Sequence, residues 1–394
     1  MLDLAAIRRD TPGTQHVVHL NNAGASLMPK PVIDAITTYI ALEAQTGGYE
    51  AADLQKEAIQ QFYSATAELL NTSADHIAAT GNATDAYARA LSSIPFERDD
   101  VILTTVNDYV SNQIAFLSLQ KRFGVKVLRA EEDSLGGVSV EDMAEKIKTL
   151  RPKLVAVTHV PTNSGLVQPL EAIGQLCQEH NVLYLVDACQ SVGQLPIDVT
   201  SIHCDFLTAT CRKFLRGPRG MGFLYVSDNV LSSGLAPLFV DLRGATWESA
   251  NTYDLLPTAR RFEYWEFPYA LVLGAAEAHR YALNVGLDAI AARNAELVTL
   301  LRNQLSQLPG VQLLDKGERL SAIITLISDR KSAADLKTAL RNEQINTSLS
   351  PREAAILDYD NKGMKTAALR ISPHYFNTER EIDTLVDSLK RLLS

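Results

Sequence analysis

The chain has 394 residues, of which 46% are hydrophobic and 21% are charged, so its composition is that of a folded protein rather than a disordered or membrane-embedded one. This length predicts two domains packed around a cleft. A formal net charge of -9 argues against a nucleic-acid partner, because such binding depends on a basic surface.

Short apolar segments alternate with helix-spaced segments through the middle of the chain. The predicted strands lie at 101–106, 125–130, 154–158, 182–187, 206–210 and 222–226, and the predicted helices lie at 111–122, 139–150 and 169–180. Strands separated by helices of this length require right-handed crossovers, which predicts an α/β fold with a mainly parallel sheet. In such sheets the ligand site lies beyond the carboxyl ends of the strands.

The pattern changes beyond about residue 265. Long helical segments are followed by predicted strands at 322–327 and 367–372 and by predicted helices at 332–342 and from 378 onward. This order is typical of a smaller α+β domain. We therefore expect a large domain at 15–264 and a small domain formed by 265–394 together with 1–14.

Targeting and metal signals are missing from the sequence. The N-terminus lacks the basic-then-apolar order of a signal peptide, and no apolar run reaches the roughly 20 residues needed to cross a bilayer. We expect a cytoplasmic protein with no membrane partner. Cysteines at 177, 189, 204 and 211 form no Cys-x-x-Cys pair, so neither a metal site nor a disulfide is expected.

Two residues carry the strongest chemical signal. Asp187 ends the apolar segment V-L-Y-L-V-D, and Lys213 follows the next predicted strand in a loop rich in basic residues and glycine. A pyridoxal 5'-phosphate (PLP) site needs a lysine that forms a Schiff base, and an acid that keeps the pyridine nitrogen protonated. An aspartate at a strand end is otherwise a common helix cap, so each residue acquires this meaning only beside the other.

The surrounding sequence resembles a known family. V-D-A-C-Q-S-V-G-Q-L-P-I-D-V at 186–199 and C-D-F-L-T-A-T-C-R-K-F-L-R-G-P-R-G-M-G-F-L-Y-V at 204–226 are similar to the cofactor core of cysteine desulfurases and other class V aminotransferases. These are fold type I PLP enzymes, whose large domain holds a seven-stranded, mainly parallel sheet. The resemblance implies that Lys213 forms the Schiff base, Asp187 pairs with the pyridine nitrogen and Gln190 contacts the phenolic oxygen. Thr210 and Arg212 would bind the phosphate, with arginine where the family often has histidine.

Three further segments extend the resemblance. A-A-T-G-N-A-T-D at 78–85 resembles the phosphate loop, so the backbone of Ala83 and Thr84 and the Thr84 hydroxyl would meet the phosphate at a helix N-terminus. Tyr109 falls at the position of the ring-stacking histidine, where an aromatic can still stack on the pyridine. In T-H-V-P-T-N-S-G at 158–165, Thr162 matches the contact to the phenolic oxygen, with Asn163 as the near alternative.

The substrate side is implied by both ends of the chain. H-L-N-N-A-G at 19–24 resembles the segment lining this side, which assigns Asn22 and Ala23 as contacts. A-L-R-I-S-P-H at 368–374 resembles the strand that carries the arginine for the substrate α-carboxylate. That position is Arg370, and a guanidinium suits a carboxylate because it can pair through two parallel hydrogen bonds.

The chain departs from the desulfurase pattern in two places. The segment 347–363, where the family has its sulfur-accepting cysteine, contains none, and Cys211 is expected to point into the phosphate loop. Trp265 and Glu266 replace a glycine and a threonine that reach the phosphate of the partner subunit. We expect Glu266 to turn away from the phosphate, toward one of three basic residues: Arg212, Arg216 or Arg219. A homodimer with the site near its interface is still expected.

These features predict a PLP-dependent enzyme acting on an amino-acid substrate. A desulfurase-like core without the acceptor cysteine favours a C–S lyase, which would release pyruvate and ammonia from cysteine, cystine or a cysteine conjugate or sulfoxide. A class V aminotransferase and an epimerase resembling isopenicillin N epimerase share the same core and remain alternatives. A non-catalytic PLP-fold or anion-binding protein is the alternative from another class.

Overall fold

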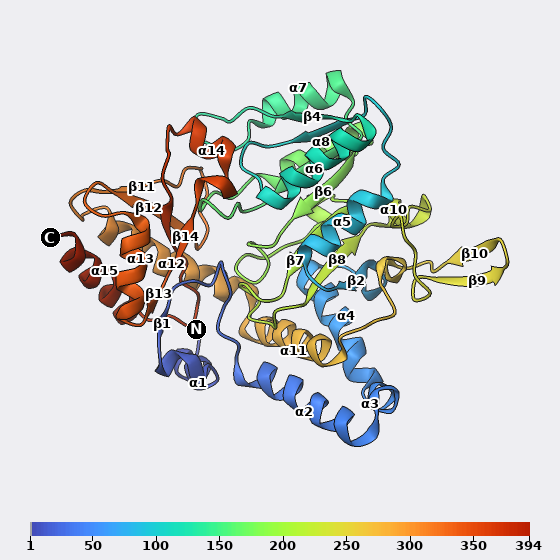
Figure 1. Cartoon of the computed structure of the whole chain (residues 1–394), viewed down its shortest axis with the longest axis horizontal. Coiled ribbons are helices and arrows are strands. Elements are labelled where there is room, and N and C mark those ends of the chain that lie inside the picture. The colour runs from blue at the N-terminus through green and yellow to red at the C-terminus, as the bar shows by residue number, and fades with distance from the viewer. Residues whose placement is uncertain (1) are drawn as a thin grey trace.

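A seven-stranded sheet forms the centre of the large domain in the computed structural model, which describes residues 2–394 (Figure 1). The strands, in spatial order, are β2 (Ile77–Thr80), β8 (Gly222–Val226), β7 (Phe206–Thr210), β6 (Leu183–Asp187), β5 (Leu154–Thr158), β3 (Val101–Thr104) and β4 (Lys126–Arg129). β8 runs opposite to the other six strands, which are parallel to one another. The mainly parallel seven-stranded sheet expected from the sequence is confirmed.

Helices cover both faces of this sheet, which explains why its strands are apolar at nearly every position. Alternate residues of β5 enter different cores: Val155 and Val157 pack on one face, Leu154 and Ala156 on the other. The first face is covered by α4 (Lys56–Leu70), α7 (Val140–Leu150), α8 (Leu170–His180) and α11 (Tyr269–Val285). The second is covered by α5 (Ala83–Ser93), α6 (Val110–Phe123) and α10 (Asp228–Ser232), and the short α9 (Val199–Ile202) joins β6 to β7.

A second sheet organises the small domain. It is antiparallel, with the order β11 (Val311–Leu313), β12 (Ile324–Ser328), β15 (Ala368–Ile371) and β14 (Ser348–Ser350). The apolar faces of α12 (Leu287–Leu305), α13 (Ala333–Asn342) and α15 (Glu379–Leu393) pack on it. α15 starts with a complete capping box, in which Thr378 and Glu381 each accept a backbone hydrogen bond from the other. The core of this domain also takes in Val160 and Phe214 from the large domain, so the two domains meet beside the β5 and β7 loops.

The N-terminal segment joins both domains. α1 (Leu4–Arg9) precedes β1 (Val18–His19), which pairs in parallel with β13 (Ile345–Asn346) of the small domain. The chain then continues into α2 (Lys30–Thr46) and α3 (Gly48–Leu54), which lie along one edge of the molecule (Figure 1). No helix within residues 2–394 is both long and apolar enough to cross a membrane.

The packing of α11 bears on the domain boundary expected between residues 264 and 265. α11 lies against α2 and α4, and its Val272 and Ala275 belong to the same core as the seven-stranded sheet. α12, in contrast, contributes Leu297 and Leu301 to the core of the small domain. On this packing we propose that the large domain extends through α11.

A hairpin and a short helix were not anticipated from the sequence. β9 (Ala245–Ser249) and β10 (Thr252–Leu255) pair in antiparallel fashion and project from the body of the molecule (Figure 1). α14 (Ile356–Asn361) lies between β14 and β15, within the segment 347–363 that lacks cysteine. It is tied to the large domain by the Asn163 amide, which donates to Asp358 over 2.8 Å.

Candidate active site

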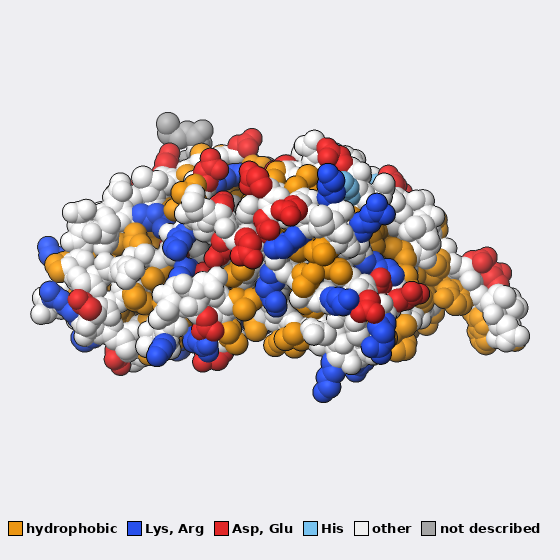
Figure 2. Space-filling view, turned by 90° about the horizontal axis from the view of Figure 1, so that it is seen from above, with side chains coloured by type: hydrophobic (Ala, Val, Ile, Leu, Met, Phe, Trp, Pro, Cys, Tyr) orange, Lys and Arg blue, Asp and Glu red, His pale blue; other side chains and the backbone are white. Residues whose placement is uncertain are grey.

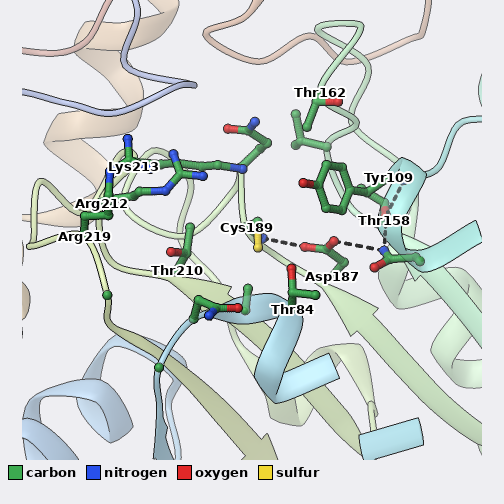
Figure 3. Close-up of a pocket in the computed structure, with 17 residues that line it drawn as sticks. Thr84, Tyr109, Thr158, Thr162, Asp187, Cys189, Thr210, Arg212, Lys213 and Arg219 are labelled. Carbon is green, nitrogen blue, oxygen red and sulfur yellow. Dashed lines mark hydrogen bonds between the residues drawn. The ribbon is translucent and has the colours of Figure 1, made fainter. Parts of the chain in front are cut away.

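A cavity of about 330 Å³ opens beyond the carboxyl ends of β5, β6 and β7 (Figure 3). Its walls come from the last residues of these strands, the loops that follow them, and the N-terminus of α5. The lining residues are Gly81, Asn82, Ala83, Thr84, Tyr109, Asn112, Thr158, Val160, Thr162, Asp187, Cys189, Gln190, Thr210, Arg212, Lys213, Arg219 and Gly220. All nine residues predicted to bind the cofactor are therefore brought together around one cavity.

Asp187 is the last residue of β6 and is buried on the cavity wall. The backbone N–H of Cys189 donates to its Oδ1 over 2.9 Å, and the side-chain amide of Asn112 donates to its Oδ2 over 3.0 Å. These two bonds fix the plane of the carboxylate, as the dashed lines of Figure 3 show. The remaining lone pairs of Asp187 can accept a proton-bearing nitrogen inside the cavity.

Lys213 lies in the loop that follows β7 and is buried against the opposite wall. Burial lowers the pKa of its ammonium below the ordinary value of 10.5, although Cys189 and Asp187 partly oppose this shift. A lowered pKa increases the fraction of neutral amine, which is the form that attacks an aldehyde. The lysine is thus placed and tuned for Schiff-base chemistry.

The basic residues of the cavity gather on the Lys213 side. Figure 3 shows Arg212 and Arg219 beside Lys213, with Tyr109, Thr158 and Asp187 across the cavity. The charge of Arg219, after burial, is the second cause that lowers the pKa of Arg212, so the two guanidinium groups are close. Neither forms an ion pair with a carboxylate within residues 2–394. This end of the cavity suits a multiply charged anion.

The N-terminus of α5 adds backbone donors to the cavity wall. Asn82 caps the helix by accepting from the N–H of Asp85, and this leaves the N–H groups of Ala83 and Thr84 outside the capping bond. Gly222 at the start of β8 permits the close approach of this turn, because a Cβ there would lie 2.8 Å from the Asn82 carbonyl carbon. Free N–H groups at a helix start attract a phosphate.

Arg370 belongs to β15 of the small domain and does not itself line the cavity, but it is bonded to the lining residue Thr162. The side chain is 8% exposed, and its Nη1 donates to the Thr162 carbonyl over 3.0 Å, while its Nε has no hydrogen-bond partner in residues 2–394. Burial lowers its pKa to about 10. A buried guanidinium without a carboxylate partner is costly, and an incoming carboxylate would relieve that cost.

Asn22 and Ala23 do not line the cavity. The Asn22 amide donates to the Ser372 carbonyl over 2.8 Å, and its oxygen accepts from the Ser26 hydroxyl over 2.6 Å, so this side chain ties the N-terminal segment to the residue that follows β15. The Ala23 carbonyl accepts from the Gln190 amide over 3.1 Å. Contact of either residue with a substrate stays a prediction, and the structure places both one layer behind the wall.

The structure does not pair Glu266 with any of the three arginines named as its expected partners, so that part of the expectation is wrong. The Glu266 side chain is exposed and forms no ion pair with Arg212, Arg216 or Arg219 within the described chain. Arg216 is instead buried and donates to the Tyr375 hydroxyl over 2.7 Å. The buried acid of this segment is Glu263, which pairs with Arg243 over 2.7 Å. The sequence could not separate two glutamates only three residues apart, because no periodic strand or helix sets their direction.

A family model described as aminotransferase class V matches residues 18–385, which is nearly the whole chain. The chain belongs to the class V aminotransferase family. It is accordingly a PLP-dependent enzyme, as the resemblance read from the sequence implied.

Two curated relatives of this class V enzyme carry different activities in their names. A probable cysteine desulfurase of Pyrococcus abyssi is 28% identical over 98% of this chain and 97% of its own length. A probable hercynylcysteine sulfoxide lyase of Mycobacterium tuberculosis is 29% identical over 94% of this chain and 89% of its own. The two identities are too similar to choose between a desulfurase and a lyase.

Solved structures share the fold of the class V enzyme. The apo cysteine desulfurase of Thermococcus onnurineus NA1 superposes with a TM-score of 0.91 at 24% identity and covers 100% of this chain and 98% of that one. The cystine C–S lyase C-DES, solved with its product cysteine persulfide, superposes with a TM-score of 0.85 at 23% identity and covers 96% of this chain and 99% of that one. Both confirm the fold type I architecture.

The residues of this class V enzyme fit PLP on structural grounds. The Gln190 side chain is 1% exposed, and its Oε1 has no partner among the described residues although the side chain borders the cavity. The cavity joins guanidinium groups that lack a carboxylate partner, a neutralisable lysine beside them, N–H donors at the start of α5, and a fixed carboxylate across from the lysine. A phosphate, a pyridine nitrogen and an aldehyde are the groups that this set of side chains complements.

Eight lining residues were not predicted from the sequence: Gly81, Asn82, Asn112, Thr158, Val160, Cys189, Arg219 and Gly220. Asn112 and Thr158 contact Asp187 and its neighbours, Arg219 adds a second guanidinium, and Cys189 places the only cysteine among the lining residues. Cys211 is instead fully buried, with its sulfur 3.4 Å from His279. A helix period counted from Tyr109 would have found Asn112, because residues three apart share one face of a helix.

Proposed function

We propose that this enzyme is a C–S lyase acting on cysteine, cystine or a cysteine conjugate or sulfoxide. With cysteine and water, the products are hydrogen sulfide, pyruvate and ammonia. PLP, when bound, supplies an electron sink for bond breaking at the substrate α-carbon. The rest of the chemistry falls to side chains of the cavity, with Lys213 as the residue that would hold the cofactor.

Substrate orientation would come from Arg370. Its Nε is unpartnered, and its Nη1 is held by the Thr162 carbonyl, so the guanidinium can turn a fixed edge toward an α-carboxylate. A carboxylate held there lies near Lys213, because Arg370 is close enough to contribute to the lowered pKa of that lysine. The Lys213 amine would then take the proton from the substrate α-carbon.

The remaining cavity residues would hold the cofactor. Asp187 would keep the pyridine nitrogen protonated, and Tyr109 would stack on the ring. Thr162 and Gln190 stand on the wall where the phenolic oxygen would lie. The phosphate would be held by Arg212, Thr210 and Thr84 together with the Ala83 N–H, and we add Arg219 to this group on the basis of its place in the cavity.

The observation that carries the choice of a lyase is the position of the cysteines. A desulfurase of the persulfide-forming kind needs a nucleophilic thiolate at the substrate. The segment 347–363 contains no cysteine, and its helix α14 is tied to the large domain through Asp358. Cys189 is the only cysteine of the cavity, and desolvation and the neighbouring Asp187 raise the pKa of its thiol. Elimination needs no acceptor thiol.

Product analysis separates the three reactions open to this active site. The PLP-loaded enzyme is incubated with cysteine, cystine, a cysteine sulfoxide and alanine, and pyruvate, ammonia, sulfide and D-amino acids are measured. A lyase gives equimolar pyruvate and ammonia from a sulfur substrate. Transamination of alanine, or racemised substrate without ammonia, would contradict the proposal, and a colourless protein after PLP loading would indicate an anion-binding protein. Cys189→Ala is the control, and a lyase keeps its pyruvate yield in this variant.

We also propose a homodimer, supported by hydrophobic side chains around the β9–β10 hairpin. Figure 2 shows the hairpin projecting at one end of the molecule with hydrophobic side chains near its root. The exposed set, with relative exposures from 39% to 79%, consists of Leu238, Phe239, Leu242, Trp247, Tyr253, Tyr264 and Trp265. Such a patch marks an interaction surface. Sedimentation should give a dimer, and Trp247→Asp should shift it toward the monomer.

Four free cysteines support a cytoplasmic location as a further proposal.

A further inference from the structure

A second buried carboxylate lies directly behind Asp187. Asp108 follows β3 and is 5% exposed, and no ion pair joins it to a cation within residues 2–394. Its Oδ1 accepts from the Tyr109 N–H over 2.7 Å and from the Asn112 amide over 3.1 Å. The Thr158 hydroxyl makes a very short hydrogen bond to the same oxygen.

The other oxygen of Asp108 faces away from the cavity. Its Oδ2 accepts from the Thr104 hydroxyl over 3.1 Å and from the Gln113 amide over 2.7 Å. The Gln113 oxygen accepts in turn from the Arg129 guanidinium over 2.6 Å. Five donors therefore point at one carboxylate. Burial raises the pKa of the Asp108 carboxyl above its ordinary value, and the hydrogen bonds that it accepts oppose this shift. Only the ionised form can accept all five donors.

Asn112 connects this carboxylate to Asp187. One nitrogen, Nδ2, lies 3.1 Å from Asp108 Oδ1 and 3.0 Å from Asp187 Oδ2, so its two hydrogens can serve one carboxylate each. The reversed amide would turn its oxygen toward two anions and lose both bonds, so Asp108 holds the orientation of Asn112. The pair of anions also makes the cavity wall more negative at the point where a ring nitrogen would meet Asp187.

We propose that Asp108 is a positioning residue for the cofactor nitrogen, acting through Asn112 and Thr158 to fix the direction and strengthen the negative potential of Asp187. This inference rests on the proposed role of Asp187 toward PLP. Asp108 does not line the cavity, so it would act by fixing Asp187, the acceptor, and would thereby raise the fraction of protonated pyridine nitrogen. If Asp108 only stabilised the start of α6, its substitution would change the stability of the protein and leave the protonation of the pyridine nitrogen unchanged.

The test compares Asp108→Asn with Thr105→Val, each loaded with PLP labelled with 15N at the ring. Thr105 is buried in the same turn, and its hydroxyl donates to the Asn107 carbonyl rather than to Asp108, so Thr105→Val removes a buried hydroxyl and leaves all donors to Asp108 in place. The 15N resonance of the bound cofactor reports protonation of the pyridine nitrogen. We expect Asp108→Asn to move it toward the unprotonated position and to lower kcat about tenfold with little change in KM, and we expect Thr105→Val to match the wild type.

Asn112→Leu provides a second variant if Asp108→Asn fails to fold, because it removes the bridge and leaves Asp108 in place. It should reproduce the 15N shift. If every folded variant that lacks Asp108 or Asn112 keeps the wild-type resonance and kcat, Asp108 only caps the helix and the inference is overturned. If the wild-type resonance shows no protonated nitrogen near Asp187, the proposed cofactor role itself fails, so the two failures are distinguishable.

Discussion

Replacing Arg370 should affect substrate selection and stability in opposite directions. Its guanidinium is 8% exposed and keeps one hydrogen bond, to the Thr162 carbonyl, with no carboxylate partner in the described chain. Replacing it by methionine preserves most of the side-chain volume and removes a buried charge. Two effects of opposite sign follow for the same substitution, one on substrate selection and one on the free energy of unfolding.

The contribution of Arg370 to substrate selection can be estimated from the two parallel hydrogen bonds that a guanidinium makes to a carboxylate. A paired, charged hydrogen-bond interaction with a carboxylate contributes about 3 kcal/mol, so Arg370→Met should lower kcat/KM for cysteine about 10²-fold. Cysteamine lacks the carboxylate and serves as the control substrate. The ratio of kcat/KM for cysteine to that for cysteamine should collapse in the variant, and an unchanged ratio would refute the role of Arg370.

The effect on stability should have the other sign. Loss of the bond to Thr162 costs about 1 kcal/mol, whereas removal of an uncompensated buried charge gains several. The cofactor-free Arg370→Met protein should therefore unfold at a higher urea concentration than the wild type. Arg302→Met is the matched control, because Arg302 pairs with the fully buried carboxylate of Asp315 over 2.8 Å. This control should lose about 3 kcal/mol of stability and keep the substrate ratio.

Three further predictions follow from the site and its surroundings. Burial lowers the pKa of Lys213 below 10.5, so its reactive neutral amine accumulates at a lower pH than that of a free lysine. The rate at which the apoenzyme captures PLP, followed by absorbance, should therefore reach half its maximum below pH 10.5. A half-maximum at or above pH 10.5 would contradict the shift. Arg219→Gln should reduce the preference for PLP over pyridoxal, which has no phosphate, about fivefold in equilibrium binding. Arg260→Gln, which changes a half-buried arginine outside the cavity lining, should leave this preference unchanged. Glu263→Gln should lower the free energy of unfolding by about 3 kcal/mol in urea, because Arg243 and the Ala79 N–H lose a buried carboxylate; a loss under 1 kcal/mol would show that the ion pair is dispensable.

The large-domain sheet could be predicted well because its strands are buried on both faces. The segments 154–158, 206–210 and 222–226 coincide with β5, β7 and β8, and the other expected strands agree within two residues at either end. Apolar runs of this kind are bounded by polar turns, so the sequence predicts both that they are strands and how long the strands are. The antiparallel direction of β8 could not be predicted, because the direction in which strands pair depends on the connection between them and not on the strand sequence.

The hairpin and α14 were missed for a different reason. β9 and β10 are mostly exposed, with Trp247 and Tyr253 open to solvent, so no alternation between core and solvent marks them as strands. α14 has only six residues and is held by Asp358 and Tyr359 more than by helix propensity. Elements that depend on tertiary contacts leave a weak local signal.

The site could be predicted where a residue ends a strand, as Asp187 and Thr210 do. Strand ends meet at one edge of the sheet, so position along the chain translates into position in space. Asn22 shows the limit of that reasoning, because its amide is used by Ser372, a partner 350 residues away. Such long-range hydrogen bonds decide which side chains face a cavity, and nothing in the local pattern records them.

The most direct test of the account is the covalent attachment of the cofactor. The protein is incubated with PLP, reduced with borohydride and digested, and the modified peptide is located by mass spectrometry. The account predicts one pyridoxyl group per chain, attached to Lys213, and none in Lys213→Ala. Attachment to a different lysine, or the absence of any modified peptide, would contradict the placement of the active site at the carboxyl ends of β5, β6 and β7.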